Sequence, residues 1–293
     1  MYKIVSKSQL ASNIFQMDIE APRVAVSALP GQFVIIRLDK TGERIPLTIC
    51  DYDPIKGTVS IVVQVVGHST IKMSEYGVGD SLQDFVGPLG QPSEFVHEDP
   101  AELAKRRIVF VAGGLGTAPV YPQVKWLHNH GIKADVIIGA KTRDLLIMVE
   151  EMRAVAGNLF IATDDGSEGY NGLVTGCLED LVVGRNFTYH QAIAIGPMIM
   201  MKFVCQLTQK LNIPTIVSLN TLMVDGTGMC GACRVTVGGK TRFACVDGPE
   251  FDGHQVDFPE AMRRQAMYKG EEGQQLFKER LKRGEEKDGS CHV

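Results

Sequence analysis

The sequence has no strong excess of charge of either sign and no apolar run long enough to cross a bilayer. Its formal net charge is -4, so the composition gives no reason to expect nucleic acid or an acidic membrane surface as a partner. The N-terminus starts directly with alternating, strand-like sequence and lacks the apolar segment of a signal peptide. These absences predict a cytoplasmic protein without a nucleic-acid or membrane partner, in a compartment where thiols stay reduced.

The seven cysteines are distributed unevenly along the chain. In a reducing compartment, clustered cysteines indicate metal binding, whereas scattered cysteines usually act as small buried hydrophobic residues. The clustered residues are Cys230, Cys233 and Cys245, and the scattered ones are Cys50, Cys177, Cys205 and Cys291.

The length of 293 residues predicts two domains with room for a small addition. Short β-branched runs separated by turn residues predict a small β barrel over residues 1–98. Apolar strands that alternate with helical segments then predict a parallel α/β sheet over residues 99–220, which begins with a polar linker at 99–107. A compact stretch rich in cysteine and glycine follows at 221–255, and a charged helical tail is expected at 256–293.

A glycine-rich turn follows the first strand of the α/β region. Residues 111–119 read Val-Ala-Gly-Gly-Leu-Gly-Thr-Ala-Pro and lead from a strand into a helix. Without side chains the backbone can approach a pyrophosphate, and the helix start offers unpaired N–H groups. The turn is therefore predicted to bind a dinucleotide, with a tight strand–helix turn without a ligand as the alternative.

Two further turns follow strands of the same region and are expected at the same edge of the sheet. One is Thr-Asp-Asp-Gly-Ser at 163–167, and the other is Gly-Pro-Met at 196–198. Lys141 and Arg143, after the second strand, are placed to contact an adenosine ribose or 2′-phosphate. Each feature alone also fits a plain turn or a solvated surface pair.

The barrel region contains two polar motifs next to strands. Arg44 to Thr48 reads Arg-Ile-Pro-Leu-Thr and suits a flavin and its phosphate, because arginine makes paired phosphate contacts and threonine adds a hydrogen bond. Gly67 to Thr70 leads into a short helix and is a plausible pyrophosphate site. The alternative is that Ser69 or Thr70 simply caps the helix.

The clustered cysteines have the spacing Asp225-x4-Cys230-x2-Cys233-x11-Cys245. Asp225 stands where the ferredoxin-type spacing Cys-x4-Cys-x2-Cys has its first cysteine, and nearby glycines allow a loop to wrap closely around a cluster. An iron–sulfur site with these four ligands is favoured. The alternative is a structural zinc site with three cysteines, although zinc usually has two separate Cys-x-x-Cys pairs.

Taken in order, these motifs resemble the ferredoxin–NADP reductase superfamily, in the branch of dihydroorotate dehydrogenase electron-transfer subunits. The resemblance covers about residues 1–255 and is most specific in the glycine-rich turn and the cysteine loop. It implies a β barrel that binds FAD, a parallel Rossmann-like α/β domain that binds NAD(H), and a small C-terminal [2Fe-2S] subdomain.

No catalytic residue is expected, because positioned cofactors carry out hydride transfer without an acid or base from the protein. The expected binding residues fall into three groups. The expected FAD ligands are Arg44, Ile45, Pro46, Leu47, Thr48, Val62, Val63, Gln64, Gly67, Ser69 and Thr70. The expected NAD ligands are Gly113, Gly114, Gly116, Thr117, Ala118, Pro119, Arg143, Asp164, Asp165, Gly196 and Pro197. The expected metal ligands are Asp225, Cys230, Cys233 and Cys245.

Asp225 is a departure from the four cysteines of the dihydroorotate dehydrogenase subunits. It makes the chain similar to the small subunits of NADH-dependent reduced ferredoxin:NADP+ oxidoreductases, a group also called sulfide dehydrogenases. That resemblance implies an electron-bifurcating heterodimer, whose larger flavin and iron–sulfur partner resembles a glutamate synthase small subunit and handles NADP(H) and ferredoxin. As a harder and less covalent ligand, the Asp225 carboxylate is expected to tune the cluster.

Three other functions remain open at this point. The chain could serve a dihydroorotate dehydrogenase, act alone as an NADH:acceptor reductase, or be a nicotinamide-binding module with a structural zinc. The first two share the cofactors of the leading prediction, whereas the third would lack both flavin and iron.

Overall fold

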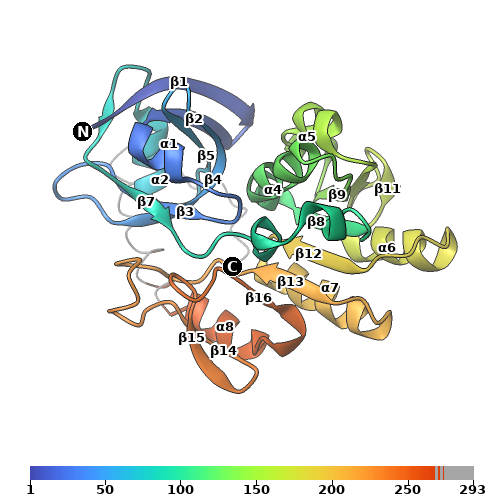
Figure 1. Cartoon of the computed structure of the whole chain (residues 1–293). Helices are drawn as coiled ribbons and strands as arrows, with labels where there is room; N and C mark the ends of the chain where they lie inside the picture. The colour runs from blue at the N-terminus through green and yellow to red at the C-terminus, as the bar shows by residue number, and fades with distance from the viewer. Residues whose placement is uncertain (268–269, 271–272, 274–293) are drawn as a thin grey trace.

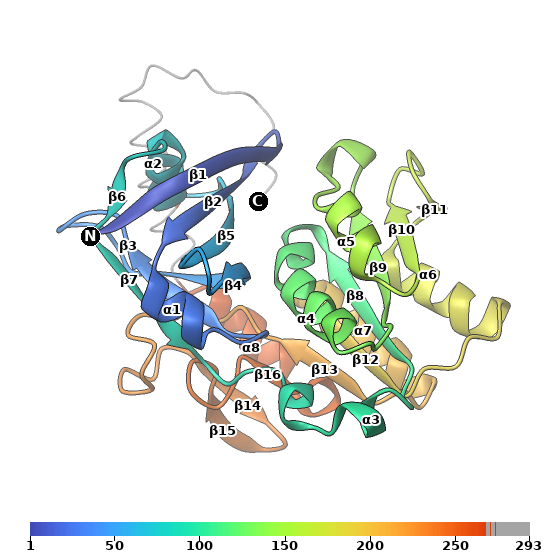
Figure 2. The ribbon, with the colours of Figure 1, turned by 45° about the horizontal axis from the view of Figure 1, so that its top comes forward.

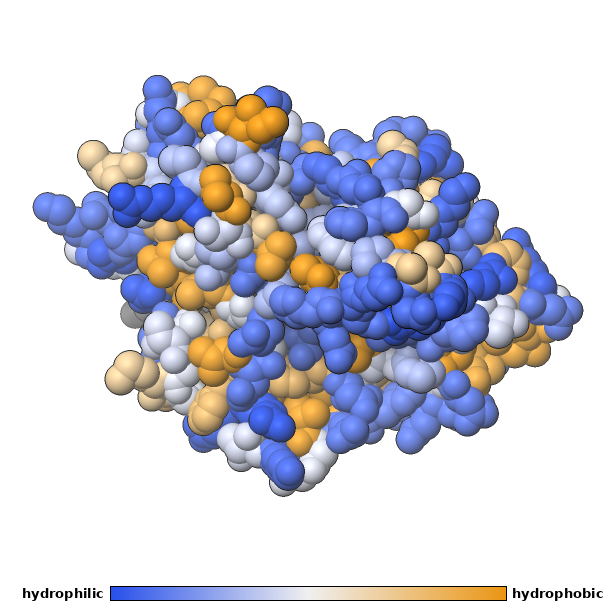
Figure 3. Space-filling model, in the orientation of Figure 1, coloured by the Kyte–Doolittle hydropathy of each residue, from blue (hydrophilic) through white to orange (hydrophobic). Residues whose placement is uncertain are grey.

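A computed structural model describes residues 1–267, 270 and 273. The chain forms a curled antiparallel sheet, an open parallel sheet beside it, and a small C-terminal unit that lies against both (Figure 1). No helix within the described residues is long and apolar enough to span a membrane. On the face seen in Figure 1, polar side chains predominate and apolar ones are scattered among them (Figure 3).

The antiparallel sheet has the strand order β6-β1-β2-β5-β4-β3-β7. Its two end strands, β6 and β7, are separated in the chain by Gln83 alone, so the sheet curls back on itself into a barrel. Buried side chains such as Phe15, Met17, Ile36 and Ile61 fill the interior. The elements are β1 (Tyr2–Ala11), β2 (Ile14–Glu20), α1 (Pro22–Ser27), β3 (Phe33–Arg37), β4 (Ile45–Asp53), β5 (Thr58–Gln64), α2 (His68–Glu75), β6 (Ser81–Leu82) and β7 (Asp84–Leu89).

The parallel sheet has the order β11-β10-β9-β8-β12-β13, with β16 added antiparallel at its edge. Its central strand β8 is buried along its whole length, as expected for a sheet covered on both faces. The strands are β8 (Ile108–Gly113), β9 (Asp135–Ala140), β10 (Leu159–Thr163), β11 (Tyr170–Asn171), β12 (Gln191–Ile195), β13 (Thr215–Ser218) and β16 (Glu250–Asp252).

Helices pack on both faces of this sheet (Figure 2). The α-helices are α4 (Thr117–Asn129), α5 (Val149–Val155), α6 (Val174–Glu179) and α7 (Met198–Lys210). Short 3-10 or π turns stand at η2 (Gly114–Gly116), η3 (Arg143–Leu145) and η4 (Asp180–Gly184), and η1 (Glu94–His97) and α3 (Pro100–Leu103) connect the barrel to β8.

The C-terminal unit consists of the cysteine loop, the hairpin of β14 (Arg234–Val237) and β15 (Lys240–Phe243), η5 (Gly253–Gln255) and α8 (Phe258–Gln265). Sequence alone suggests that residues 221–255 stand apart, but β16 within this stretch pairs with β13 and extends the α/β sheet. The predicted division of the chain after residues 98, 220 and 255 remains a prediction. Cys291 and most of the predicted helical tail lie outside the described residues.

Candidate functional site

The glycine-rich turn after β8 lies at the point where the strand order of the parallel sheet reverses. The chain runs from β8 outward through β9 and β10 on one side, and through β12 and β13 on the other. Open α/β sheets bind ligands at the carboxyl ends of the strands at such a point. Gly113 to Pro119 follows β8, and Gly196 and Pro197 follow β12, so the sheet brings these two predicted NAD segments side by side.

The approach of the two turns is so close that glycine is required. A Cβ atom on Gly116 would lie 2.1 Å from the carbonyl oxygen of Ile195, and one on Gly196 would lie 3.1 Å from the backbone nitrogen of Gly113. A Cβ atom on Gly113 would lie 2.3 Å from the sulfur of Met200. The absence of side chains at these glycines therefore lets the start of α4 lie directly against the end of β12.

The start of α4 presents backbone rather than side chains. Thr117 and Ala118 are buried, and the Thr117 hydroxyl donates a hydrogen bond to the carbonyl oxygen of Gly114. Any contact of this turn with a pyrophosphate would therefore come from the N–H groups of the helix start, where the helix dipole favours an anion. Gly114 has a φ of +54° and open space around it, which leaves the turn accessible.

The other predicted NAD residues lie at the ends of β9 and β10. The backbone N–H of Arg143 donates to the Ser167 hydroxyl at 2.8 Å, which joins the two loops. Asp165 accepts hydrogen bonds from the Ser167 hydroxyl and N–H, and these bonds lower the pKa of its carboxyl. The Arg143 side chain is exposed, as is Asp164. Arg143 lies 3.9 Å from Asp144 in an exposed ion pair, and Lys141 beside it is exposed as well, so this edge carries two cations among exposed carboxylates.

The predicted FAD residues come together at one end of the barrel. β4 and β5 are antiparallel neighbours, so Arg44 to Thr48 at the start of β4 lie next to Val62 to Gln64 at the end of β5. The Ser69 hydroxyl donates to the Glu43 carboxylate at 2.6 Å, which brings the start of α2 to the same place.

Thr70 has a structural role in this arrangement. Its hydroxyl accepts hydrogen bonds from the N–H groups of Val66 and Gly67 at 3.0 Å each, and donates to the Gly67 carbonyl. This is the helix-capping alternative that the sequence left open. Val62 and Val63 are likewise buried in apolar clusters, so they shape the barrel wall rather than present polar groups.

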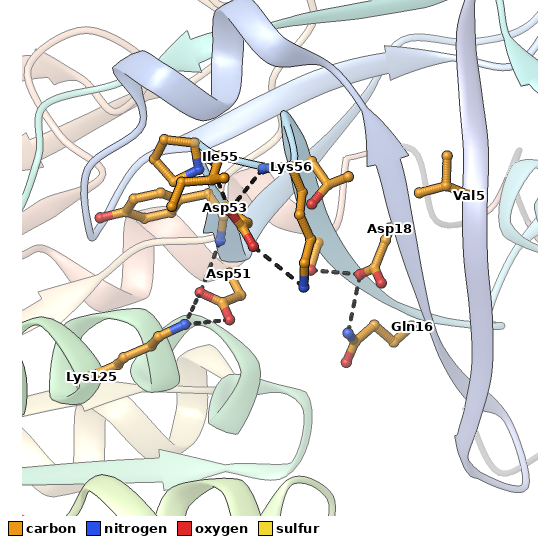
Figure 4. Close-up of a pocket in the computed structure, with 12 residues that line it drawn as sticks. Val5, Gln16, Asp18, Asp51, Asp53, Ile55, Lys56 and Lys125 are labelled. Carbon is orange, nitrogen blue, oxygen red and sulfur yellow. Dashed lines mark hydrogen bonds and ion pairs between the residues drawn. The ribbon is translucent and has the colours of Figure 1, made fainter.

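The predicted flavin and nicotinamide segments pack against one another. Val62 and Cys50 of the barrel share a buried cluster with Ala118 of α4 and with Ile147 and Met148 before α5. Outside this cluster, Lys125 of α4 contacts both carboxylate oxygens of Asp51 on β4, at 2.8 and 2.7 Å (Figure 4). Apolar packing and an ion pair thus fix the start of α4 against the barrel.

Asp51 and Lys125 also line a cavity of about 520 Å³ on the outside of this joint (Figure 4). Asp18 and Asp53 line the same cavity, and none of the predicted FAD or NAD residues does. Lys56 and Lys125, which also line the cavity, are paired with Asp53 and Asp51, so its lining carries a net negative charge that does not favour a phosphate group. The cavity therefore has no role in the cofactor assignment.

The cysteine loop brings two of its four predicted ligands together. The Sγ atoms of Cys233 and Cys245 lie 3.2 Å apart in a buried cluster with Met223, Ile35 and Phe33, and both thiols are free. Cys230 is exposed. Across residues 1–267, 270 and 273, no three side chains of His, Cys, Asp or Glu converge as a metal-binding group, so the side chains of Asp225 and Cys230 do not complete one with the thiol pair.

The carboxylate of Asp225 is directed into its own loop. It accepts hydrogen bonds from the backbone N–H of Thr227 at 2.9 Å and of Cys230 at 2.8 Å. The bond from Thr227, followed by that from Cys230, lowers the pKa of Asp225, so the group is an anion at neutral pH. Its oxygens thus lie next to the backbone of one predicted ligand.

The donor set of the loop fits an iron–sulfur cluster. The loop supplies two adjacent thiols, an accessible third thiol and an ionised carboxylate within a short stretch. Gly226, Gly228 and Gly231 have φ values of +76°, +82° and +67°, a conformation that lets the chain wrap and turn its N–H groups inward. Packing of the protein places only the thiols of Cys233 and Cys245 next to each other. The side chains of Asp225 and Cys230 would turn toward them when the metal binds.

Glu250 on β16 is a polar residue at the centre of the molecule that the sequence pattern did not reveal. Its Oε1 atom accepts hydrogen bonds from the Ser93 hydroxyl at 3.0 Å and from the Gln123 amide at 2.8 Å. Burial raises the pKa of Glu250 to about 7, against the opposing effect of these two bonds. Glu250 therefore joins the barrel linker, helix α4 and the C-terminal unit, and the only signal for it in the sequence is an acidic residue inside a short strand.

Comparison with known proteins agrees with this arrangement. Residues 220–257 match the family model described as the iron–sulfur cluster binding domain of dihydroorotate dehydrogenase B. A protein of Clostridium beijerinckii, known as an uncharacterized protein in the adh 3′ region, is 64% identical over 93% of this chain and 92% of its own length. A Thermotoga maritima homologue of the electron transfer subunit of dihydroorotate dehydrogenase B (NAD(+)) is 45% identical over 92% of each chain.

Solved structures extend the comparison to the fold. The structure of an NADH-dependent reduced ferredoxin-NADP oxidoreductase, studied for flavin-based electron bifurcation, superposes with a TM-score of 0.88 at 43% identity and covers 96% of this chain and 98% of that one. An Amycolatopsis cytochrome P450 reductase has a TM-score of 0.59 at 16% identity over 71% of this chain and 65% of its own, a likeness of fold alone.

The predicted fold class, a ferredoxin–NADP reductase-like barrel with a parallel α/β sheet and a small C-terminal iron–sulfur unit, is confirmed. The Thermotoga maritima relative and one of Desulforamulus reducens, 30% identical over 87% of this chain and 96% of its own, are named as a homologue and an electron transfer subunit of dihydroorotate dehydrogenase B. The chain belongs to the family of dihydroorotate dehydrogenase B electron-transfer subunits and their homologues.

Proposed function

We propose that this chain is the NAD(H)-linked electron-transfer subunit of a heterodimeric oxidoreductase, with FAD on its barrel and a [2Fe-2S] cluster in its cysteine loop. The observation that carries the proposal is that one barrel contacts both other sites. Its strands β4 and β5 lie against the start of α4, and its strand β3 packs against the thiols of Cys233 and Cys245. A flavin held on this barrel would lie between a nicotinamide and a cluster.

FAD, when bound, exchanges two electrons with a nicotinamide and single electrons with an iron–sulfur cluster. The protein contributes position and exclusion of water. The turn from Gly113 to Pro119 would hold the pyrophosphate of NAD through the N–H groups of its residues other than Pro119, and Gly196 and Pro197 would form the opposite wall. Arg143 would contact the adenosine side, next to Asp164 and Asp165.

On the barrel, Arg44 to Thr48 and Gly67 to Ser69 would hold FAD, with Val62 to Gln64 as the wall of its site. Cys233 and Cys245 would ligate one part of the cluster, and Asp225 with Cys230 the other. The hydride step would need no acid or base from the protein, so no residue is proposed for that role.

The finer form of the proposal concerns the partner. The chain would pair with a larger flavin and iron–sulfur subunit, similar to a glutamate synthase small subunit, that handles NADP(H) and ferredoxin in an electron-bifurcating complex of the cytoplasm. The similarity over nearly the whole length to the NADH-dependent reduced ferredoxin-NADP oxidoreductase supports this form, as does the aspartate at the first ligand position.

The second candidate is the electron-transfer subunit of an NAD-dependent dihydroorotate dehydrogenase. The family model over residues 220–257 and relatives at 30–31% identity favour it. The two candidates share cofactors and differ in the large subunit.

Isolation of the native complex separates the two. We expect the co-purified large subunit to support NADH-dependent reduction of NADP+ by reduced ferredoxin. A large subunit that oxidises dihydroorotate and ignores ferredoxin would establish the second candidate instead. A colourless, zinc-containing protein would contradict both and leave a nicotinamide-binding module.

A further inference from the structure

The side chain of Arg44 reaches from the flavin motif to the cysteine loop. Its Nε atom donates to the carbonyl oxygen of Val224 at 2.9 Å, and its Nη2 atom donates to the carbonyl oxygen of Asp225 at 3.3 Å. These residues lie 180 and 181 positions away in the chain. The guanidinium thus bonds the backbone of a predicted cluster ligand, although its motif predicts a flavin phosphate contact.

The loop is fastened to the barrel at the same place. A Cβ atom on Gly226 would lie 2.6 Å from Ile35 Cδ1 and 2.8 Å from Leu89 Cδ1, so the loop backbone rests directly on β3 and β7. Arg44 precedes β4, the neighbour of β3. The apolar contact and the two hydrogen bonds hold the loop from adjacent strands.

The contact continues to a second ligand. Arg44 holds the carbonyl group of Asp225, and the carboxylate of the same residue holds the backbone N–H of Cys230. A movement of the guanidinium would therefore displace the backbone at both Asp225 and Cys230. These are the two predicted ligands that the packing of the loop does not gather.

Two properties of arginine matter in this position. The guanidinium donates from a rigid fork, so one group can hold two successive carbonyl oxygens and still have N–H donors for a phosphate. It also carries a fixed positive charge, which stabilises the more negative, reduced form of a nearby cluster. A lysine would keep the charge and lose the fork.

We propose that Arg44 is a positioning residue of the iron–sulfur loop, which fixes the loop against the flavin-binding strand and raises the reduction potential of the cluster. The proposal rests on the proposed function, since it requires a cluster in the loop. It predicts that the flavin site and the ligand loop are mechanically coupled through one side chain.

The test compares Arg44→Gln and Arg44→Lys with the wild type in the full-length protein, together with Arg37→Gln and Arg37→Lys as matched controls. Arg37 is also a barrel arginine, but it pairs with Asp84 at 2.7 Å and with the carbonyl of Lys40, within the barrel. The readouts are the midpoint potential of the cluster and amide hydrogen exchange of residues 225–230 in the metal-free protein. Wild type stripped of flavin corrects for any loss of FAD.

Arg44→Gln is expected to lower the cluster midpoint below that of flavin-free wild type and to speed exchange at residues 225–230. Arg44→Lys is expected to restore most of the potential but not the slow exchange, and both Arg37 variants to behave as wild type. If Arg44→Gln does not fold, faster exchange in Arg44→Lys than in Arg37→Lys carries the test.

A midpoint and an exchange rate equal to those of flavin-free wild type would overturn the proposal and leave Arg44 as a flavin phosphate ligand. Failure of the proposed function looks different, because the wild type itself would then show no iron and no cluster signal.

Discussion

The glycine turn after β8 and the cysteine loop are both rich in glycine, but they use it for different reasons. Gly116 has an ordinary φ of -60° and is required because its neighbour Ile195 leaves no room for a Cβ atom. Gly231 has a φ of +67°, and a Cβ atom added there would lie 3.7 Å from its nearest neighbour, Phe243 Cε1. Glycine is needed at Gly116 for close approach between elements and at Gly231 for backbone conformation, and each region also holds one glycine of the other kind, Gly114 with a φ of +54° and Gly226 packed on Ile35.

The difference matters for how each site is built. Close approach joins two parallel strands and makes the nicotinamide turn part of the rigid sheet, complete without a ligand. The cysteine loop gathers two thiols by packing, and we expect Asp225 and Cys230, the other two predicted ligands, to be placed by Arg44 and by the metal. We therefore expect the predicted nicotinamide site to be preformed and the predicted cluster site to be completed on cluster assembly.

The largest expected effect is at the thiol pair. Cys245→Ala removes a buried ligand next to Cys233, so we expect complete loss of bound iron and of the cluster spectrum with flavin retained. Iron analysis and visible spectroscopy measure this, with Cys177→Ala on α6 as the control that should keep its iron. If Cys245→Ala retained its iron, the metal would have to bind outside the cysteine loop.

The next effect concerns close approach. Gly116→Ala places a Cβ atom against a backbone carbonyl and should destabilise the protein by about 2–3 kcal/mol, with loss of flavin reduction by NADH. Urea unfolding and anaerobic NADH reduction measure the two parts. Gly77→Ala, where the nearest atom is an Asp80 oxygen at 3.9 Å, should change stability by less than about 0.5 kcal/mol. Equal effects of both variants would refute the close-approach argument.

A smaller effect is expected at Glu250 of β16, which accepts hydrogen bonds from Ser93 and from Gln123 of α4. The pKa of Glu250 is raised from 4.5 to about 7, so the folded state holds this proton more tightly than the unfolded state does. Stability should therefore fall as pH rises from about 5 to about 7 and then level off, by on the order of 2 kcal/mol after allowance for partial exposure. Glu250→Gln should flatten this dependence in urea unfolding. A variant as pH-dependent as the wild type would assign the slope to another group.

The smallest effect tests backbone conformation. Gly231→Ala keeps enough space but strains a positive φ, which costs about 1 kcal/mol. Gly231→Asn should lose less, because asparagine tolerates this conformation better. Thermal unfolding of the metal-free protein measures both. If alanine and asparagine were equally harmful, side-chain space rather than φ would govern the loop.

The sequence predicted what depends on neighbours along the chain. The strand, glycine turn and helix at residues 108–129 form a local pattern, and so do the cysteine spacing and the capping of α2 by Thr70. The strands at 159–163, 191–195 and 215–218 agree with the prediction of apolar strands that alternate with helical segments over residues 99–220.

Contacts between distant segments were not predictable in the same way. The bond of Arg44 to Asp225, the position of Glu250 and the pairing of β16 with β13 each join residues that no short pattern connects. The donors and acceptors of a side chain show from the sequence that it needs a partner when buried, but which partner it has depends on the tertiary structure. For Asp225 the sequence predicted a ligand position, and the structure added that its carboxylate accepts hydrogen bonds from the backbone of its own loop.

The most direct test is an anaerobic titration of the purified chain with NADH, followed by visible absorption and electron paramagnetic resonance, with iron and zinc measured on the same sample. The account predicts bound flavin and iron, bleaching of the flavin by NADH and the signal of a reduced [2Fe-2S] cluster. A protein that contains zinc in place of iron, or whose flavin and cluster do not respond to NADH, would contradict it.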